Sequence, residues 1–369
     1  HGGCGERHCR AGRAVLRRLP GAGLVAPDFT WETVTQMDFG FDASFLNNRL
    51  TGTFDWYRRN TKDMLVAGAT LPATLGASVP KSNSADMKTI GWELSLGWND
   101  RLENGFSYWV KGVLSDYQAT ITKYAGNDAG FYSQSDGDGK YYVGQKIGEI
   151  WGYHSNGLFQ SDDEAATIDQ SELYAGKWGA GDVKYEDLDN DGKITKGEET
   201  IYNPGDKSII GNKTPRYQFG ITVGFDYKNF DFEMFWQGTG KRDYMLSGAQ
   251  FWGFTSQWDV PYTPALDYWT ETNTDAYFPR PGWQNGGNRV TSDRYLQSAA
   301  YGRLKNLTVG YTIPKNLTTK WGISRLRLYV TGENLLTITP LNDAFDPETL
   351  GGMTYPINRK VAIGLNLTL

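Results

Sequence analysis

Alternation of apolar and polar residues is the strongest pattern along this chain. In the last nine residues every second position is apolar, from Val361 through Ile363 to Leu369, and the positions between them are small or polar. A β-strand with this period presents an apolar face on one side and a polar face on the other. An ordinary strand has about 5 to 6 residues, whereas a tilted strand needs roughly 9 to 11 to cross a bilayer. Several alternating segments here reach the longer range, which favours a transmembrane β-barrel.

The alternation predicts nine long strands joined by connections of alternating length. The strands lie at about residues 37–45, 50–58, 90–98, 106–110, 217–225, 230–236, 301–313, 325–337 and 357–369. Turns near residues 47, 101, 228 and 314–323 are short, and the connections at about 60–85, 123–213, 247–294 and 340–356 are long. Bacterial outer-membrane barrels have short periplasmic turns and long extracellular loops. We therefore predict an all-β, antiparallel barrel portion with its C-terminus at the periplasmic side.

An odd number of strands does not close a barrel of the usual even-numbered kind. Its first and last strands would leave unpaired backbone groups in lipid. We therefore expect an incomplete barrel, with the missing strands upstream of Trp31.

Composition agrees with a barrel but leaves a second interpretation open. The chain has 13 Trp, 22 Tyr, 17 Phe and 45 Gly, a mixture that favours sheets, tight turns and aromatic residues at membrane interfaces. A soluble β-sandwich would alternate in the same way. The alternative function is therefore a soluble or surface-attached, β-rich glycan-binding module. Aromatic residues near predicted strand ends, such as Trp98 and Tyr311, favour the barrel.

Residues 1–26 do not share the alternating pattern. They hold both cysteines, and five arginines against one glutamate, so the rest of the chain is acidic and does not suit nucleic acid as a partner. His1, Cys4, His8 and Cys9 offer zinc-binding atoms, but their spacing matches no common zinc site. We expect residues 1–26 to lie outside the fold and residues 27–369 to form the barrel portion.

Residues 187–198 match a twelve-position calcium loop with a glycine, Gly192, at its sharp turn. The predicted ligands are Asp187, Asp189, Asp191, the carbonyl of Lys193, Thr195 and Glu198. Calcium takes six to eight oxygen ligands, which a curled acidic loop supplies. The alternative is a solvated acidic turn. Because no flanking helices are evident, we predict Ca²⁺ that ties down a loop rather than a switching pair of EF-hands.

The connection from Leu246 to Arg294 carries more aromatic residues than a polar loop needs. One interpretation is a platform that stacks on sugar or peptide ligands, and its candidate residues are Trp252, Trp258, Trp269 and Trp283. The other is a hydrophobic cluster that packs the loop on itself.

No catalytic constellation stands out, and we expect no enzymatic activity. The acid pairs Asp162/Asp163 and Glu198/Glu199 could suggest glycoside hydrolysis. That chemistry needs two carboxylates roughly 5 to 9.5 Å apart across a sugar, which neighbours in sequence do not indicate. Ser161 before the first pair predicts the cap of a short helix running to about Tyr174.

Several separate motifs resemble one family. They are the run from Thr30 to Leu65, Gly181 to Tyr185 before the Asp-rich turn, Ile210 to Tyr217, Tyr301 to Tyr311, and Leu328 to Leu336. In this order, over about residues 27–369, they resemble the C-terminal barrel portion of SusC/RagA-type TonB-linked (TonB-dependent) outer-membrane transporters.

The resemblance implies a barrel in outer-membrane lipid that imports oligosaccharides or peptides under a surface lipoprotein lid of the SusD type. It also implies TonB as a partner, through an N-terminal part that includes a plug. This sequence has no segment that resembles the plug or the TonB-contacting part, so we expect that the chain alone is not competent for transport.

Overall fold

Nine long strands form one antiparallel sheet in the computed structural model, which describes residues 29–67, 81–125, 127, 130–131, 141–350, 355 and 357–369. The strands are β1 (Thr33–Phe45), β2 (Leu50–Ala67), β3 (Lys81–Arg101), β4 (Ser107–Tyr124), β9 (Arg216–Tyr227), β10 (Phe230–Lys241), β13 (Tyr301–Thr312), β14 (Arg325–Ile338) and β15 (Lys360–Thr368). They neighbour one another in this order. The predicted nine-stranded, antiparallel architecture is confirmed, whereas residues 1–26 lie outside the described residues.

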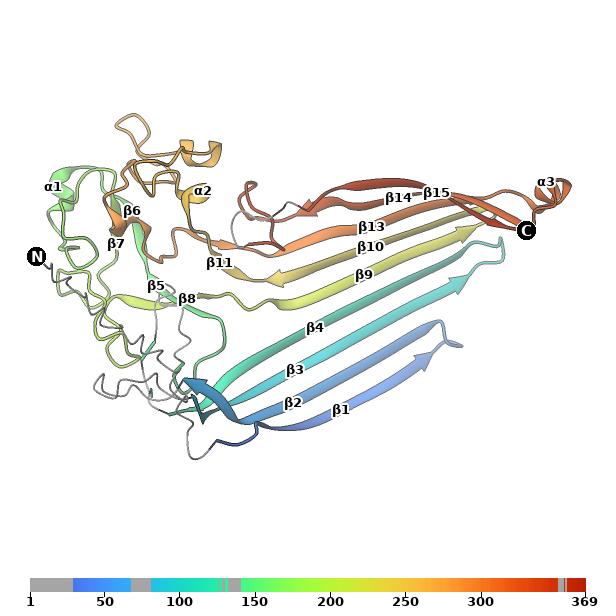
Figure 1. Cartoon of the computed structure of the whole chain (residues 1–369), viewed down its shortest axis with the longest axis horizontal. Helices are drawn as coiled ribbons and strands as arrows, with labels where there is room; N and C mark the ends of the chain where they lie inside the picture. Colours follow the sequence, from blue (N-terminus) through green and yellow to red (C-terminus); the bar gives the residue numbers. More distant parts are fainter. Residues whose placement is uncertain are drawn as a thin grey trace, which may run out of the picture.

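Short turns lie at one end of the sheet and long connections at the other (Figure 1). The turn between β1 and β2 shows why the chain reverses there. Leu46, Asn47 and Asn48 all have positive φ values, of 55°, 58° and 66°, and asparagine tolerates this left-handed conformation better than most residues. The C-terminus lies at the short-turn end, as the alternation of connection lengths predicts.

The register between strands places apolar side chains on one face of the sheet. Phe41, Phe54, Leu94, Leu114 and Phe219 lie opposite one another in turn across β1, β2, β3, β4 and β9. Phe41 is exposed, and the other four side chains of the row are partly exposed. A continuous row of apolar side chains that is not covered by protein is unfavourable in water and favourable against lipid.

Polar residues and glycines dominate the opposite face. Two glycines there, Gly91 and Gly364, lie directly opposite tyrosines on the next strand, Tyr57 and Tyr329 respectively. A side chain added at either glycine would collide with the tyrosine ring, so each ring covers the backbone of its partner. Trp109 covers Gly224 in the same way.

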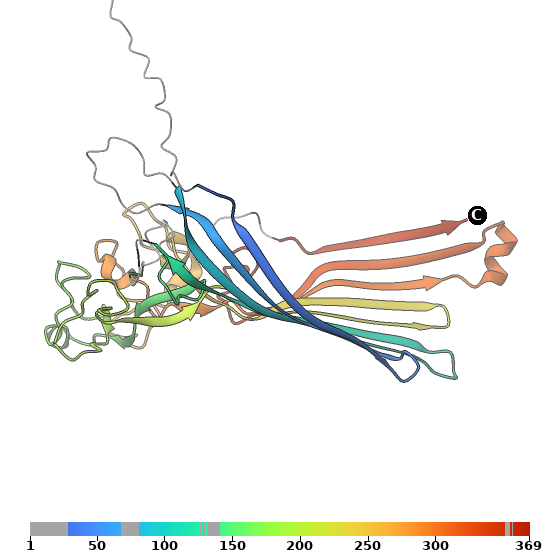
Figure 2. The same ribbon diagram turned by 90° about the horizontal axis from the view of Figure 1, so that it is seen from below.

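The sheet is curved but open, as Figure 2 shows. Within the described residues β1 and β15 are its edge strands, and each pairs with a neighbour on one side only. The expected incomplete barrel is confirmed. No helix among the described residues is long and apolar enough to cross a membrane.

The long connections fold into a compact layer beyond the strand ends (Figure 1). We call its described residues 141–215, 242–300 and 339–350 the cap. Three small antiparallel pairs build it, namely β5 (Glu149–Tyr153) with β8 (Lys207–Asn212), β6 (Ser155–Leu158) with β7 (Val183–Tyr185), and β11 (Asp243–Met245) with β12 (Leu296–Ser298).

Short helical turns complete the described structure. They are α1 (Asp162–Ala165), α2 (Ala249–Trp252), η3 (Thr263–Leu266) and η4 (Gly286–Arg289) in the cap, and α3 (Lys315–Thr318) with η5 (Thr319–Trp321) between β13 and β14.

Helix α1 begins where the sequence predicts but ends early. The Ser161 hydroxyl accepts the Glu164 N–H at 3.1 Å, as a cap should. The predicted extension to Tyr174 is wrong, because the following residues bond to distant segments. The Asp169 carbonyl accepts the Ile194 N–H at 2.8 Å, and the Gln170 side chain accepts the Tyr185 N–H at 2.9 Å.

Candidate functional site

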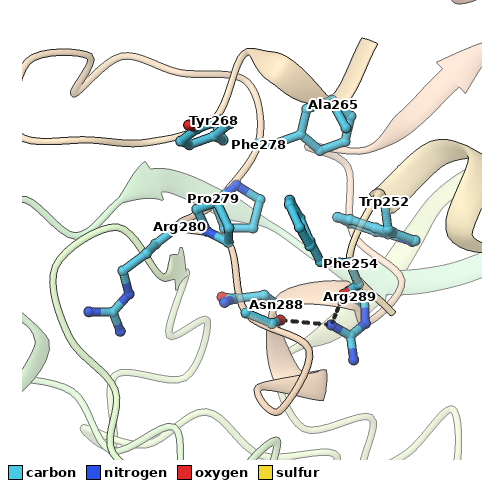
Figure 3. A pocket seen from close by; sticks show the side chains of 11 residues that line it. Trp252, Phe254, Ala265, Tyr268, Phe278, Pro279, Arg280, Asn288 and Arg289 are labelled. Atoms are coloured by element: carbon cyan, nitrogen blue, oxygen red, sulfur yellow. Dashed lines mark hydrogen bonds between the residues drawn. The ribbon is translucent and has the colours of Figure 1, made fainter. Parts of the chain in front are cut away.

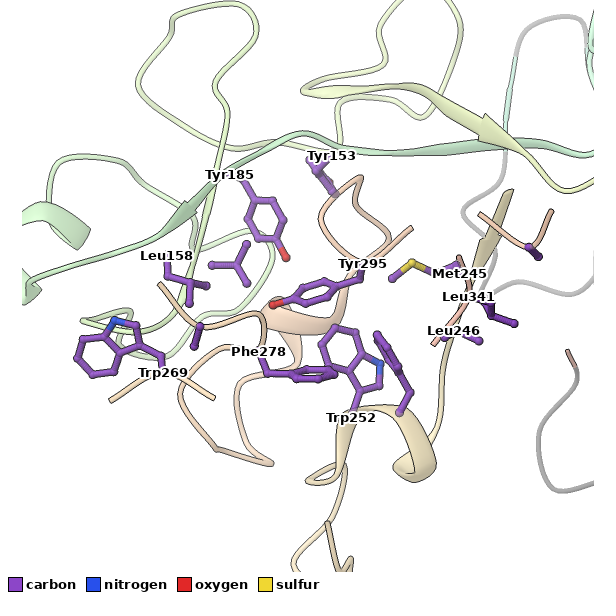
Figure 4. Close-up of a cluster of buried hydrophobic side chains, with 14 of the residues drawn as sticks. Tyr153, Leu158, Tyr185, Met245, Leu246, Trp252, Trp269, Phe278, Tyr295 and Leu341 are labelled. Atoms are coloured by element: carbon purple, nitrogen blue, oxygen red, sulfur yellow. The ribbon is translucent and has the colours of Figure 1, made fainter. Parts of the chain in front are cut away.

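A buried aromatic core holds the cap together. It draws side chains from all three of the cap's loop regions, including Tyr185, Phe251, Tyr295 and Leu341 (Figure 4). Phe251 makes edge-on ring contacts with several of its aromatic neighbours, including Tyr295, at a centroid distance of 6.3 Å. Such contacts add to the stabilisation from burial itself. Most aromatic residues of the 246–294 connection therefore pack the cap.

The four candidate stacking tryptophans divide into two pairs. Trp252 and Trp269 are each only 8% exposed and belong to the buried core, as the packing interpretation describes. Trp258 is 83% exposed and Trp283 is 46% exposed. Only the second pair presents ring surface to a ligand, and its role in binding stays a prediction.

A crevice beside Trp252 gathers aromatic, proline and arginine side chains (Figure 3). Its cavity volume of about 20 Å³ is room for about one water molecule, not for a sugar ring. The Arg289 guanidinium donates to the carbonyl of Phe254 at 3.3 Å and to that of Trp283 at 3.0 Å. These bonds fasten the loop, and the crevice is a packing feature rather than a ligand pocket.

The predicted calcium loop is curled by its own hydrogen bonds. The Asp187 carboxylate accepts the N–H groups of Asn190 and Gly192, both at 2.7 Å, and that of Asp191 at 3.2 Å. Gly192 has a φ of 81°, the left-handed conformation that favours glycine at the sharp turn. The turn thus has the backbone form that the motif predicts.

Three carboxylates meet in this loop, and one of them lies outside the motif. Side-chain oxygens of Asp187, Asp189 and Asp206 lie within 4.8 Å of one another. Asp206 is buried and accepts the N–H groups of Leu188 and Thr195, both at 2.7 Å. Asp206 was not predicted from the sequence, because it lies beyond the twelve residues of the calcium pattern and no motif marks it.

The other predicted ligands are not part of this group of three. The Asp191 carboxylate accepts the N–H of Lys193 at 2.8 Å. The backbone N–H of Glu198 donates to the carbonyl of Asn203 at 3.0 Å. Thr195 is connected to the group through its N–H bond to Asp206.

Two carboxyl groups of the loop have pKa values shifted in opposite directions. Burial raises the pKa of Asp189, and repulsion from Asp191, Asp206 and Asp187 raises it further. Burial also raises the pKa of Asp187, but the N–H groups of Gly192, Asn190 and Asp191 outweigh it and leave the pKa below its usual value. A cation would relieve the repulsion. Calcium binding stays a prediction.

One member of each acid pair considered for catalysis forms an ion pair within the cap. Asp162 forms an ion pair with Lys177 at 2.6 Å and accepts the Ala180 N–H at 3.0 Å. Glu199 pairs with Lys207, also at 2.6 Å. Each joins segments that are separate in sequence.

A buried arginine ties the last loop region of the cap to the sheet. Arg303 of β13 is 2% exposed and forms ion pairs with Asp346 at 2.5 Å and Glu348 at 3.3 Å. Lys305 also pairs with Glu348, at 2.8 Å. Sequence analysis missed this cluster, because 43 positions separate Arg303 from Asp346 and no local motif connects them.

A long-stranded antiparallel sheet with one apolar face, one polar face and all long loops at one end defines an outer-membrane β-barrel protein. The family model for the β-barrel of TonB dependent receptor-like proteins matches residues 12–335. The chain therefore belongs to the TonB-dependent receptor β-barrel family, which resides in the outer membrane.

Individual relatives agree with this assignment. TonB-dependent receptor P3 of Formosa agariphila is 30% identical over 380 residues, covering 94% of this chain and 35% of that protein. TonB-dependent receptor SusC of Bacteroides thetaiotaomicron is 26% identical over 344 residues, covering 91% of this chain and 32% of that protein. The chain thus spans about a third of the length of these relatives.

A solved structure shows the same fold. The structure of the RagAB peptide transporter superposes with a TM-score of 0.71 at 22% sequence identity, covering 92% of this chain and 36% of that one. The predicted resemblance to SusC/RagA-type proteins is confirmed.

Proposed function

We propose that this chain supplies nine strands and the covering loops of an outer-membrane importer for oligosaccharides or peptides. In this proposal further strands complete the barrel, TonB drives uptake, and a surface lipoprotein of the SusD type covers the loops. The observation that carries it is the two-faced sheet with its cap. An apolar exterior suits lipid, a polar interior suits a hydrated passage, and a cap at one end suits the capture of solutes.

The polar face supports a hydrophilic cargo. Its alternate positions carry hydroxyl, amide and charged groups, for example Thr308 and Thr331, whose hydroxyl oxygens lie 2.9 Å apart. Asp231 and Arg327 form an ion pair on the same face. The exposed rings of Trp258 and Trp283 in the cap add surfaces on which a sugar or a peptide side chain can stack.

Cysteine labelling tests the two faces. With Cys4 and Cys9 replaced by serine, Ala362→Cys and Ile363→Cys place a thiol on opposite faces of β15. In outer membranes, a water-soluble maleimide should label the first variant and leave the second unlabelled. Equal labelling of both, together with a monodisperse monomer in the absence of detergent, would instead support the soluble glycan-binding module.

Uptake by cells tests the cargo. In cells that produce the transporter containing this chain, replacing both Trp258 and Trp283 by alanine should reduce uptake of labelled oligosaccharide or labelled peptide, whichever class is the cargo. Surface abundance, measured with an antibody, should stay constant because both rings are exposed. Unchanged uptake of both classes would contradict the role of these rings.

A further inference from the structure

Asp293, His154 and Ser208 form a continuous hydrogen-bonded row in the cap. The distance from Asp293 Oδ2 to His154 Nδ1 is 2.7 Å, and that from His154 Nε2 to Ser208 Oγ is also 2.7 Å. We propose that Ser208 is a nucleophile activated by His154, and that activated esters acylate it. The row would then be a covalent modification site. The inference goes beyond the importer and does not depend on it.

The carboxylate is held in position on both oxygens. Its second oxygen, Oδ1, accepts the N–H of Ser155 at 3.0 Å, and the N–H of Asp293 donates to the carbonyl of Tyr153 at 3.1 Å. An ionised carboxylate only accepts, so its bond to the ring assigns the imidazole proton to Nδ1. Nε2 then has a free lone pair and accepts from the Ser208 hydroxyl. This is the order of nucleophile, base and orienting acid on which activated serines depend.

Three separate segments bring these groups together. His154 lies between β5 and β6, Ser208 lies on β8 opposite Gly152, and Asp293 comes from the segment before β12. The His154 and Asp293 side chains are 34% and 40% exposed, so a small reagent can approach. No sequence motif marks the row, because its members are 54 and 139 positions apart.

Cationic side chains of neighbouring residues have partners of their own. Glu186 bonds to His154 through the backbone, where its N–H donates to the carbonyl of His154 at 2.9 Å. Lys207, next to Ser208, pairs with Glu199, and Lys184 of β7 pairs with Glu164. Arg294, next to Asp293, donates to the carbonyls of Ala276 and Tyr277. Among the charged side chains in the described part of the chain, Asp293 is hydrogen-bonded to the ring.

The proposed step is an acyl transfer. Ser208 Oγ forms a bond to the acyl carbon of the ester, and the bond between that carbon and the leaving oxygen breaks. The serine proton passes to His154 Nε2 and then to the departing alkoxide. The products are an acyl-serine and an alcohol, with no oxidation or reduction.

The test compares two serines in the full chain folded in detergent. After incubation with p-nitrophenyl acetate, peptide mass analysis measures acetylation of Ser208 and of Ser171, an exposed serine of the cap. A positioned base accelerates such a step by roughly 10²-fold or more, so Ser208 should be acetylated about 100-fold faster. His154→Gln retains a hydrogen-bonding side chain but no base, and should reduce the rate at Ser208 to that at Ser171. Asp293→Asn should reduce it as well.

The unsubstituted chain provides a second readout in case a variant fails to fold. Acetylation of Ser208 and of Ser171 is measured within one sample of that chain, and the rate at Ser208 should be about 100-fold higher. The alternative is that the row only fastens two loops of the cap. That role gives equal acetylation of Ser208 and Ser171 in the unsubstituted chain, and this result would overturn the proposal.

Discussion

The sheet and the cap place the same types of residue in opposite environments. In the sheet, Phe39 is 66% exposed and Ile363 is 83% exposed, whereas in the cap Phe251 and Tyr295 are fully buried. The sheet has apolar residues at every second position and faces lipid with them. The cap has no such period, and its apolar residues meet through contacts between distant segments. Exposed apolar side chains of the sheet therefore form the surface that meets lipid, whereas most apolar side chains of the cap serve its own packing.

The largest expected effect is a loss of stability in the cap that leaves the sheet folded. Phe251→Ala leaves a cavity in the aromatic core and should destabilise the cap by about 3 to 5 kcal/mol. Limited proteolysis should detect rapid cleavage within the cap, while the heat-dependent gel mobility typical of folded barrels persists. The matched control is Trp258→Ala, an exposed ring in the same connection, for which a change within about 0.5 kcal/mol is expected. Equal cleavage of both variants would show that the buried core does not hold the cap.

A charge on the lipid face should have the next largest effect. Ile363→Arg places a guanidinium among apolar neighbours and should destabilise the membrane-inserted state by about 2 to 4 kcal/mol. Ala362→Arg alters the adjacent residue of β15 on the polar face and should be tolerated far better. Urea unfolding in lipid vesicles measures the difference. A larger loss for Ala362→Arg would reverse the assignment of the two faces.

Adding a methyl group beneath a ring should have a smaller effect. Gly91→Ala pushes against the ring of Tyr57 and should cost about 1 to 3 kcal/mol in the same unfolding assay. Gly112→Ala is the control, because no heavy atom lies within 4 Å of a side chain added there. Combining Gly91→Ala with Tyr57→Ala should remove the clash. If the double variant loses as much unfolding free energy as the two single variants added together, the Tyr57 ring does not cover Gly91.

The smallest expected effect is local and concerns calcium. Because the pKa of Asp189 is raised in the folded loop, the loop is stabilised while this carboxyl is protonated, and the stabilisation is lost as pH rises through the folded pKa. At neutral pH without calcium, Asp189→Asn should therefore slow protease cleavage between Gly181 and Asn212.

With calcium, the native loop should be cleaved more slowly than the Asp189→Asn loop, the reverse of the order expected without calcium. It should protect the native loop by replacing repulsion with coordination, and protect Asp189→Asn less. Asp189→Ala combined with Asp191→Ala should abolish the calcium effect. Cleavage of the native loop at the same rate with calcium and with chelator would leave only an acidic turn.

Sequence reasoning located the strands well because their signal is local. It ended β2 at Arg58, whereas the strand continues to Ala67. Beyond Arg58 polar residues follow one another, so the alternation fails, yet the ladder to β3 continues through pairs such as Asn60 with Lys88. Backbone pairing persists where both faces are polar, and a period of two does not reveal it.

The cap was much less predictable because its contacts are long-range. The pairing of Trp151 with Ile209 joins β5 to β8, and neither segment alternates long enough to indicate a strand. The turn at Asp187 was found from its motif, whereas Asp206, its buried third carboxylate, was not. Local patterns predict what a segment can form, and distant partners decide what it contacts.

The rings that cover glycines also bear on how much room the barrel interior offers. Tyr57, Trp109 and Tyr329 each lie across a glycine on the next strand instead of standing out from the wall. A large aromatic side chain in this position takes up the space that the missing side chain leaves, and so protrudes less into the interior. The wall thereby gains the packing of bulky residues with less intrusion into the space that its polar face borders.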